Sequence, residues 1–232
     1  QFQSEENMPV MDKRGIFASD EALTRHIIRE ADNTSEPFFF FAVTLQGHGP
    51  YEHNRYAKNT IEVDAPTLSD GNTSALATYT QGVKEADQSL KALMDWAKKR
   101  RRETIIVLFG DHLPPLNEVY TESGYMANVV ATRKASVATM KREHETPLVI
   151  WSSKRGVQKD IGSVSPSQLP YYIVRMAGYR HPYYTGMLGR VAERYSVIDR
   201  HQLIARNNKA QADWALSGRI DPLIRDYRLL QH

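Results

Sequence analysis

The sequence predicts an α/β fold with a largely parallel sheet and helices on both faces. Three continuous apolar runs, at residues 37–45, 104–109 and 147–151, have the composition of strands that are buried on both faces. Segments with apolar residues at helical spacing separate these runs. Strands and helices that alternate in this way are typical of a parallel sheet covered by helices on both sides.

Two helices are predicted in the first half of the chain. Residues 19–31 form the first, because Ser19 is a suitable N-cap residue and the next two residues are acidic. The second covers residues 75–99, where one helical face carries Val83, Ala86, Leu90, Leu93, Met94 and Ala97. This helix leads directly into the predicted strand at residues 104–109.

The C-terminal third has one further predicted helix and a weaker pattern beyond it. Residues 168–177 have helical spacing, and Gly178 favours the end of a helix there. From about residue 199, the clear apolar anchors are residues 213–216 and 222–224. With 41% hydrophobic and 25% charged residues, the chain can bury a sizeable core, so residues 1–232 are predicted to form a single α/β domain.

Composition excludes several classes of function. The 30 Lys and Arg residues are scattered among 27 Asp and Glu residues, except for a basic run at residues 98–102 that fits a solvated helix C-terminus. No nucleic-acid partner is therefore expected. The chain has no cysteine, so any bound metal must use oxygen and imidazole ligands.

The sequence contains neither a predicted membrane-spanning segment nor a predicted signal peptide. The longest strongly apolar run, at residues 37–45, is far shorter than the roughly 20 residues of a membrane-spanning helix. The first residues include neither an initiator Met nor the basic and apolar regions of a signal peptide. The sequence is therefore expected to be a piece of a longer protein.

Residues that could carry chemistry follow two of the predicted strands. His48 lies between two glycines and could donate a hydrogen bond to a phosphate or sulfate oxygen. Asp111 and His112 follow the strand at residues 104–109, where Gly110 would permit a turn that brings both donors to one divalent cation. Each loop alone also fits an ordinary turn with an incidental histidine. Because ligands bind beyond the carboxyl ends of such strands, the three side chains are expected to gather at one edge of the sheet.

The segment that contains Asp111 and His112 resembles a known metal loop. Residues 104–116, Thr-Ile-Ile-Val-Leu-Phe-Gly-Asp-His-Leu-Pro-Pro-Leu, closely resemble the strand and metal loop of the lipoteichoic acid synthase and sulfatase-like branch of the alkaline phosphatase superfamily. The resemblance extends in the same order to residues 37–51, 83–96, 145–151 and 169–178. It implies an alkaline-phosphatase-like fold, of which this chain is the C-terminal portion with the N-terminal part missing.

The resemblance also implies roles for individual residues. Asp111 and His112 would ligate one divalent metal, with manganese as the first candidate and zinc, magnesium or calcium as alternatives, and His48 would bind the substrate. The hydroxyl nucleophile and the remaining acidic ligand would lie upstream of residues 37–45. No residue before that run matches either of them, and Thr24 and Thr34 are poor candidates. The chain alone is therefore expected to be inactive and to bind metal weakly, and further ligands would have to come from His144, Glu145, His181 or Glu118.

For the complete enzyme, the resemblance implies transfer of a phosphoglycerol-type group from a phospholipid head group to a glycan or glycolipid. A metal-activated hydroxyl would attack the phosphodiester and form a covalent intermediate. An extracytoplasmic location follows, with a membrane tether expected only in the missing upstream part.

Three alternatives stay open at this point. Residues 48–56 also resemble the corresponding loop of phosphoethanolamine transferases, so the transferred group is undecided. A sulfatase or phosphatase would hydrolyse sulfate or phosphate esters at the same site, although Gln168 stands where sulfatases often carry Asp. A non-catalytic remnant of the fold that binds a glycan or a protein is the third alternative.

Overall fold

The computed structural model describes residues 2–199, 202–212, 214–216 and 220–231, and these residues fall into two units. Unit 1 comprises the residues up to 101 together with residues 114–130. Unit 2 comprises residues 102–113 together with the residues from 131 onward. The prediction of one domain over residues 1–232 stays a prediction.

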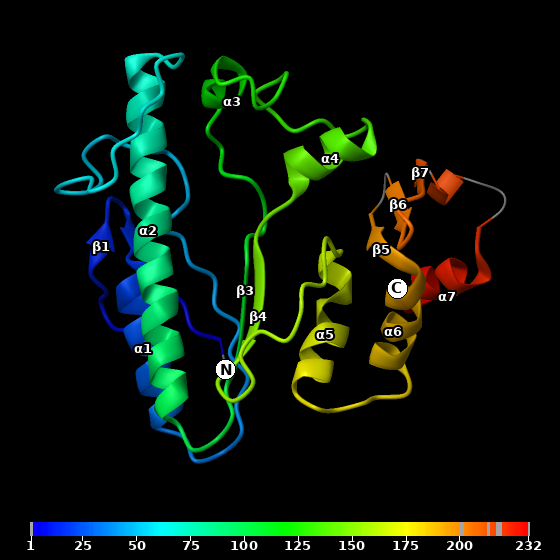
Figure 1. Ribbon diagram of the computed structural model, residues 1–232. Coiled ribbons are helices and arrows are strands. Elements are labelled where there is room, and N and C mark those ends of the chain that lie inside the picture. Colours follow the sequence, from blue (N-terminus) through cyan, green and yellow to red (C-terminus); the bar gives the residue numbers. More distant parts are fainter. Residues whose placement is uncertain (1, 200–201, 213, 217–219, 232) are drawn as a thin grey trace. The chain divides into compact units, whose positions relative to one another are not determined.

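Two helices form the body of unit 1. Helix α1 (Asp20–Asp32) lies beside α2 (Asp70–Lys99), as Figure 1 shows. A short antiparallel hairpin, β1 (Lys13–Arg14) and β2 (Phe17–Ala18), precedes α1, and α3 (Glu118–Glu122) contacts α2. Both predicted helices are confirmed, although α2 begins at Asp70 rather than at residue 75.

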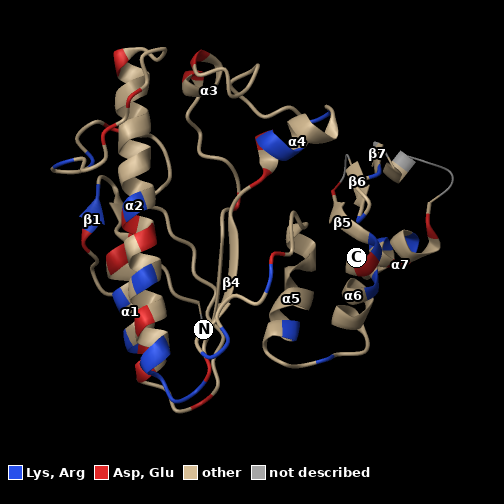
Figure 2. Cartoon of the chain, in the orientation of Figure 1, with Lys and Arg blue, Asp and Glu red and all other residues tan. Residues whose placement is uncertain are grey.

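Local chemistry explains the ends of these helices. The Ser19 side chain accepts a hydrogen bond from the backbone nitrogen of Ala22 at 3.1 Å, so it satisfies one of the unpaired N–H groups of the first turn. Helix α2 ends in Lys98 and Lys99, whose charges favour a helix C-terminus. Basic and acidic residues are mixed along both helices (Figure 2), so the basic run belongs to a mixed charged surface.

The prediction of a strand at residues 37–45 is wrong for this structure. The segment has no regular secondary structure, and no strand pair among the described residues includes it. Its side chains are exposed, with Phe39 at 81%, Phe41 at 71% and Val43 at 61%. A strand needs hydrogen-bonding partners as well as apolar side chains, and the sequence pattern reports only the second of these requirements.

Unit 2 contains the other two predicted strands, in an arrangement that differs from the prediction. Strands β3 (Ile105–Phe109) and β4 (Leu148–Ser152) pair along their whole length, with Val107 opposite Ile150. They are antiparallel, and so is each other strand pair of the described residues. The expectation of a largely parallel sheet is therefore wrong for the strands that pair within this chain. Apolar composition does not determine strand direction, and the expected burial on both faces is also wrong for β3, where Leu108 and Phe109 are exposed at 38% and 40%.

The C-terminal part of unit 2 is built around one hydrophobic cluster. The remaining elements of unit 2 are α4 (Val137–His144), α5 (Leu169–Met176), α6 (Tyr184–Arg194), β5 (Tyr195–Ile198), β6 (Gln202–Ala205), β7 (Ala210–Ala212) and α7 (Pro222–Leu230), with 3₁₀ turns at Pro166–Gln168 and Trp214–Leu216. The cluster contains Met187, Leu188, Val191, Ile198, Leu203, Trp214, Ile224 and Tyr227. The predicted anchors Trp214 and Ile224 are thus confirmed, whereas residue 213 lies outside the described residues. The predicted helix at 168–177 is α5, and Gly178 follows it with a φ of 82°.

Within the described ranges, no helix meets both the length and the hydropathy of a membrane span.

Candidate functional site

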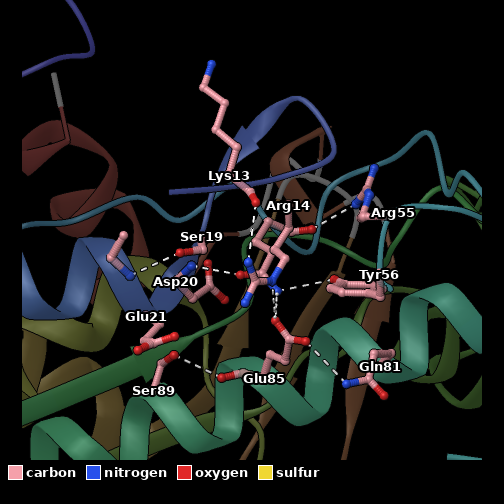
Figure 3. A network of polar contacts seen from close by, with 12 residues as sticks. Lys13, Arg14, Ser19, Asp20, Glu21, Arg55, Tyr56, Gln81, Glu85 and Ser89 are labelled. Atoms are coloured by element: carbon pink, nitrogen blue, oxygen red, sulfur yellow. Dashed lines mark hydrogen bonds and ion pairs between the residues drawn. The ribbon is translucent and has the colours of Figure 1, made fainter. Parts of the chain in front are cut away.

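The loop that carries His48 is anchored in unit 1 by Gln46. The Gln46 side chain is 1% exposed and accepts a hydrogen bond from the backbone nitrogen of Asp20 at 2.8 Å. Its amide nitrogen donates to Tyr56 Oη at 3.2 Å and to Glu85 Oε2 at 2.9 Å. These contacts fix the start of the His48 loop to both α1 and α2, and Figure 3 shows Asp20, Tyr56 and Glu85 converging.

Two carboxyl groups take part in this network. Burial raises the pKa of Asp20 to about 6 and outweighs a hydrogen bond with Gln46 that lowers it, while the nearby charge of Glu85 adds to the rise. Glu85 accepts hydrogen bonds from Arg14 Nε at 3.2 Å and from Gln81 Nε2 at 3.3 Å, in addition to that from Gln46. The network therefore joins β1, α1 and α2 to the loop through polar contacts.

Gly82 makes room for this loop on α2. A Cβ atom at residue 82 would lie 2.9 Å from Tyr56 Oη and 3.9 Å from the Cα of Gly47. A glycine within a helix costs about 1 kcal/mol relative to alanine, so the helix accepts a local loss of stability at this position. The loop can approach α2 closely because residue 82 has no side chain.

The His48 ring is oriented by the next residue of the chain. Its Nδ1 atom lies 2.7 Å from the carbonyl oxygen of Gly49, and because a carbonyl only accepts, Nδ1 carries a proton. The ring also contacts the edge of Phe17 in β2, with 5.9 Å between the ring centroids. A neutral His48 therefore has its lone pair at Nε2, and only its imidazolium form donates from both nitrogens.

Asp111 and His112 follow β3 in unit 2, as predicted. The preceding residue, Gly110, lies against Thr146, whose Oγ1 donates to the Gly110 carbonyl oxygen at 2.6 Å. A Cβ atom at residue 110 would lie only 3.0 Å from the Cβ of Thr146. Gly110 does not have a positive φ. Its role is close approach to Thr146, which corrects the expectation that it permits the turn.

The donor atoms of Asp111 and His112 lie close enough to share one cation. Asp111 Oδ2 is 3.5 Å from His112 Nε2, and two ligands of a tetrahedral site with bonds of about 2.1 Å lie about 3.4 Å apart. His112 Nδ1 lies 2.7 Å from the Leu113 carbonyl oxygen, so a neutral ring has its lone pair at Nε2. Metal-bound histidines usually donate their other N–H in this way. The two residues therefore fit half of a divalent metal site.

A third ligand does not join this pair within the part of the chain that the structure describes. Groups of three or more His, Asp or Glu residues with metal-binding geometry are absent there. His144 Nε2 contacts the Thr132 carbonyl oxygen at 2.7 Å, and Glu145 pairs with Lys141 at 3.7 Å. The other two candidates, His181 and Glu118, are exposed.

The predicted site residues are divided between the two units. His48 belongs to unit 1, whereas Asp111 and His112 belong to unit 2. The expectation that they gather at one edge of a sheet stays a prediction. Each loop nevertheless has a defined local geometry that suits its predicted role.

Gln168, which stands where sulfatases often carry Asp, has a structural role in this chain. It is fully buried, and its Oε1 accepts a hydrogen bond from the Ser165 backbone nitrogen at 3.1 Å. Its Nε2 donates to the Tyr195 carbonyl oxygen at 3.1 Å. Both contacts tie the start of α5 to the neighbouring structure of unit 2, so Gln168 acts as an anchor.

Sequence reasoning missed the residues that hold the His48 loop in place. Gln46 binds partners 26 and 39 residues away along the chain, and through them it connects two different helices. Helical periodicity carries no information about such distant pairing. The available signal was that Gln46 directly follows the apolar run at residues 37–45. A polar residue at such a position is too common to identify an anchor.

Comparison with known protein families and sequences gives one family match and several relatives. Residues 1–179 match the family described as Sulfatase. A putative cyclic beta-1,2-glucan modification protein of Rhizobium meliloti is 63% identical over 231 residues, which cover 100% of this chain and 36% of that protein. The capsular polysaccharide biosynthesis protein RkpI of the same organism is 29% identical over 107 residues, or 45% of this chain and 18% of that protein.

A solved structure shares the fold. The Streptococcus pyogenes phosphoglycerol transferase GacH, in complex with sn-glycerol-1-phosphate, superposes with a TM-score of 0.69 at 17% sequence identity. The match covers 97% of this chain and 50% of the GacH chain. The chain thus spans half of this structure and about a third of the 63% identical Rhizobium meliloti protein. The predicted resemblance to the sulfatase-like branch is confirmed.

Proposed function

Because this chain belongs to the sulfatase family, we propose that it is the C-terminal part of a metal-dependent, phosphodiester-cleaving transferase. The transferred group would be of the phosphoglycerol type, taken from a phospholipid head group on the extracytoplasmic side of a membrane. The acceptor would be a glucan, as the name of the 63% identical relative suggests. Phosphatase or sulfatase activity is the alternative that the same site would support with water as the acceptor.

One observation carries this proposal: the 3.5 Å separation of Asp111 Oδ2 and His112 Nε2. The carbonyl oxygen of Leu113 holds His112 in the tautomer that leaves the lone pair at Nε2, so both residues are prepared to hold a cation. A divalent cation held there, with manganese as the first candidate, would supply Lewis-acid stabilisation of charge on the phosphoryl oxygens.

His48 would bind the anionic group that is transferred. Its Nδ1–H donates to Gly49, so a hydrogen bond from Nε2 to a phosphoryl oxygen requires the imidazolium form. A cationic donor also forms the stronger, charge-assisted hydrogen bond to an anion. The nucleophilic hydroxyl that covalent transfer requires is proposed to lie outside this chain.

The test is phosphoglycerol transfer by the full-length protein to a cyclic β-glucan, measured as a mass increase of the glucan. Asp111→Asn and His112→Ala should each lower turnover by more than about 100-fold. Substitution of residues that only hydrogen-bond to a metal ligand already lowers metal affinity or activity by about 10–100-fold. Glu193→Gln is the matched control for Asp111→Asn, since it neutralises an exposed carboxylate of the same unit, and it should change turnover by less than about twofold.

Parallel assays with nitrophenyl phosphate and nitrophenyl sulfate separate the alternatives. Hydrolysis of these esters without transfer to the glucan would support the phosphatase or sulfatase reading. Turnover that survives Asp111→Asn would contradict the metal role of this residue.

A further inference from the structure

Arg55 is a buried cation in the loop that carries His48. Its side chain is 1% exposed, although arginine is among the residues that proteins bury least often. Arg55 and His48 belong to the same unit and lie seven residues apart. A charge at this depth needs compensating partners, and those partners identify its role.

The guanidinium group of Arg55 uses each of its donors within the loop. Nη1 donates to the carbonyl oxygens of Gln46 and His48, at 2.8 Å in both cases, and Nη2 donates to that of Pro50. Nε and Nη2 donate to the carboxylate of Glu52 at 3.0 and 2.8 Å. These five hydrogen bonds equal the five N–H donors of a guanidinium group.

The acceptors define what the group holds. The three carbonyls belong to every second residue of a five-residue stretch with His48 at its centre. The backbone of His48 is therefore fixed directly, and so are the residues two positions before and after it. Because its donors are committed to the loop, Arg55 has none left for a substrate anion.

The Phe17 ring provides a second connection between Arg55 and His48. The Arg55 guanidinium lies 5.4 Å from the centroid of the Phe17 ring, and the His48 ring meets the same Phe17 at 5.9 Å. Phe17 therefore contacts both the cation and the imidazole. Displacement of Arg55 would remove the hydrogen bonds to the backbone and one packing partner of the Phe17 ring that contacts His48.

We propose that Arg55 is the positioning residue for His48, holding the imidazole in the direction from which it binds the phosphoryl group. This role rests on the proposed function and deepens it. A lysine could keep the charge and the Glu52 ion pair, but it has three donors on a flexible stem and cannot hold three carbonyls in one plane. The planar fork, rather than the charge, is what the loop requires.

A double-mutant cycle in the full-length protein tests this role. Arg55→Lys should lower kcat/KM by about tenfold when His48 is present, and by less than about twofold in a His48→Ala background, because Arg55 acts through His48. Equal losses in both backgrounds would overturn the proposal. If Arg55→Lys fails to fold, Glu52→Gln loosens the same group, and its smaller loss should vanish in the same background.

Arg100→Lys is the matched control. Arg100 is a largely buried arginine of the same unit, with a side chain that is 17% exposed. Its guanidinium also lies against aromatic rings and donates to a backbone carbonyl, in this case that of Ala31 at the end of α1. This substitution should change kcat/KM by less than about twofold, since Arg100 makes no contact with the loop residues 46–52.

Hydrogen exchange separates failure of this inference from failure of the proposed function. In the full-length protein, backbone amides of residues 46–52 should exchange at least about tenfold faster in Arg55→Lys than in the parent or in Arg100→Lys. If the parent shows no transfer on any substrate, the proposed function fails, and exchange still reports on the loop. Unchanged exchange in Arg55→Lys would overturn the positioning role whatever the activity.

Discussion

At the scale of single residues, a backbone carbonyl sets the chemistry of both candidate histidines. His48 donates from Nδ1 to Gly49, and His112 donates from Nδ1 to Leu113, each at 2.7 Å and each to the residue that follows it. The sequence identified both histidines as candidates. It did not predict their tautomers, because these depend on how the chain turns after each residue.

Asp20 makes unfolding depend on pH. Its folded pKa of about 6 lies above the ordinary 3.8, so the folded state binds the proton more tightly, and its contribution to stability is lost as pH rises from about 4 to about 6. Asp20→Asn removes this ionisation. The variant should therefore gain up to about 3 kcal/mol relative to the parent over that window, measured by urea unfolding at several pH values.

Glu21→Gln is the control for Asp20→Asn, because it removes an exposed carboxylate from the same helical turn. It should change the free energy of unfolding by less than about 0.5 kcal/mol at every pH. A difference between Asp20→Asn and the parent that stays constant from pH 4 to pH 7 would show that Asp20 ionises normally in the fold.

At the scale of elements, α1 and α2 provide a matched pair of N-caps. Ser19 makes a capping hydrogen bond to Ala22, whereas the exposed Ser69 occupies the same position in α2 without one. Ser19→Ala should therefore cost about 1 kcal/mol in the free energy of unfolding, and Ser69→Ala less than about half of that. Denaturant unfolding of the two variants checks this difference, and equal costs would contradict the capping role of Ser19.

Elements governed by local rules were predictable, and those governed by distant pairing were not. The helix at 19–31 and the strand at 104–109 follow from N-cap chemistry and from apolar composition. The direction of β4 and the exposure of residues 37–45 depend on which segments pair, and no local pattern encodes that choice. Helix α6 was missed because two glycines and several polar residues interrupt its apolar pattern.

The candidate site divides along the same line. The position of Asp111 and His112 directly after β3 was predictable because an apolar run precedes them, while their role as metal ligands stays a prediction. The roles of Arg55 and Gln46 in holding the His48 loop were not predictable. Arg55 binds backbone carbonyl oxygens, and Gln46 binds a helix that is distant in the sequence. Candidate functional residues are therefore easier to identify from a single sequence than the residues that position them.

At the scale of the whole molecule, an incomplete ligand set predicts weak metal binding by this chain alone. Two ligands leave most of a divalent cation to water, whereas protein sites generally use three or four. Calorimetric titration with manganese or zinc should show a dissociation constant no tighter than about 0.1 mM, and Asp111→Ala should weaken it further. Micromolar binding would show that a third ligand exists within the 232 residues.

The contact between Gly110 and Thr146 also bears on how this protein can change during evolution. It closes a loop of 36 residues whose two ends are the metal-ligand segment and the start of β4. Doubling the length of a flexible loop costs only about 0.6 kcal/mol in closure entropy. The segment between Gly110 and Thr146 also contains α3, α4 and buried residues such as Val119 and Met140, so insertions should be cheap only at its exposed turns, for example at residues 127–130. Such insertions leave the Gly110–Thr146 contact, and with it the position of Asp111 and His112, unchanged.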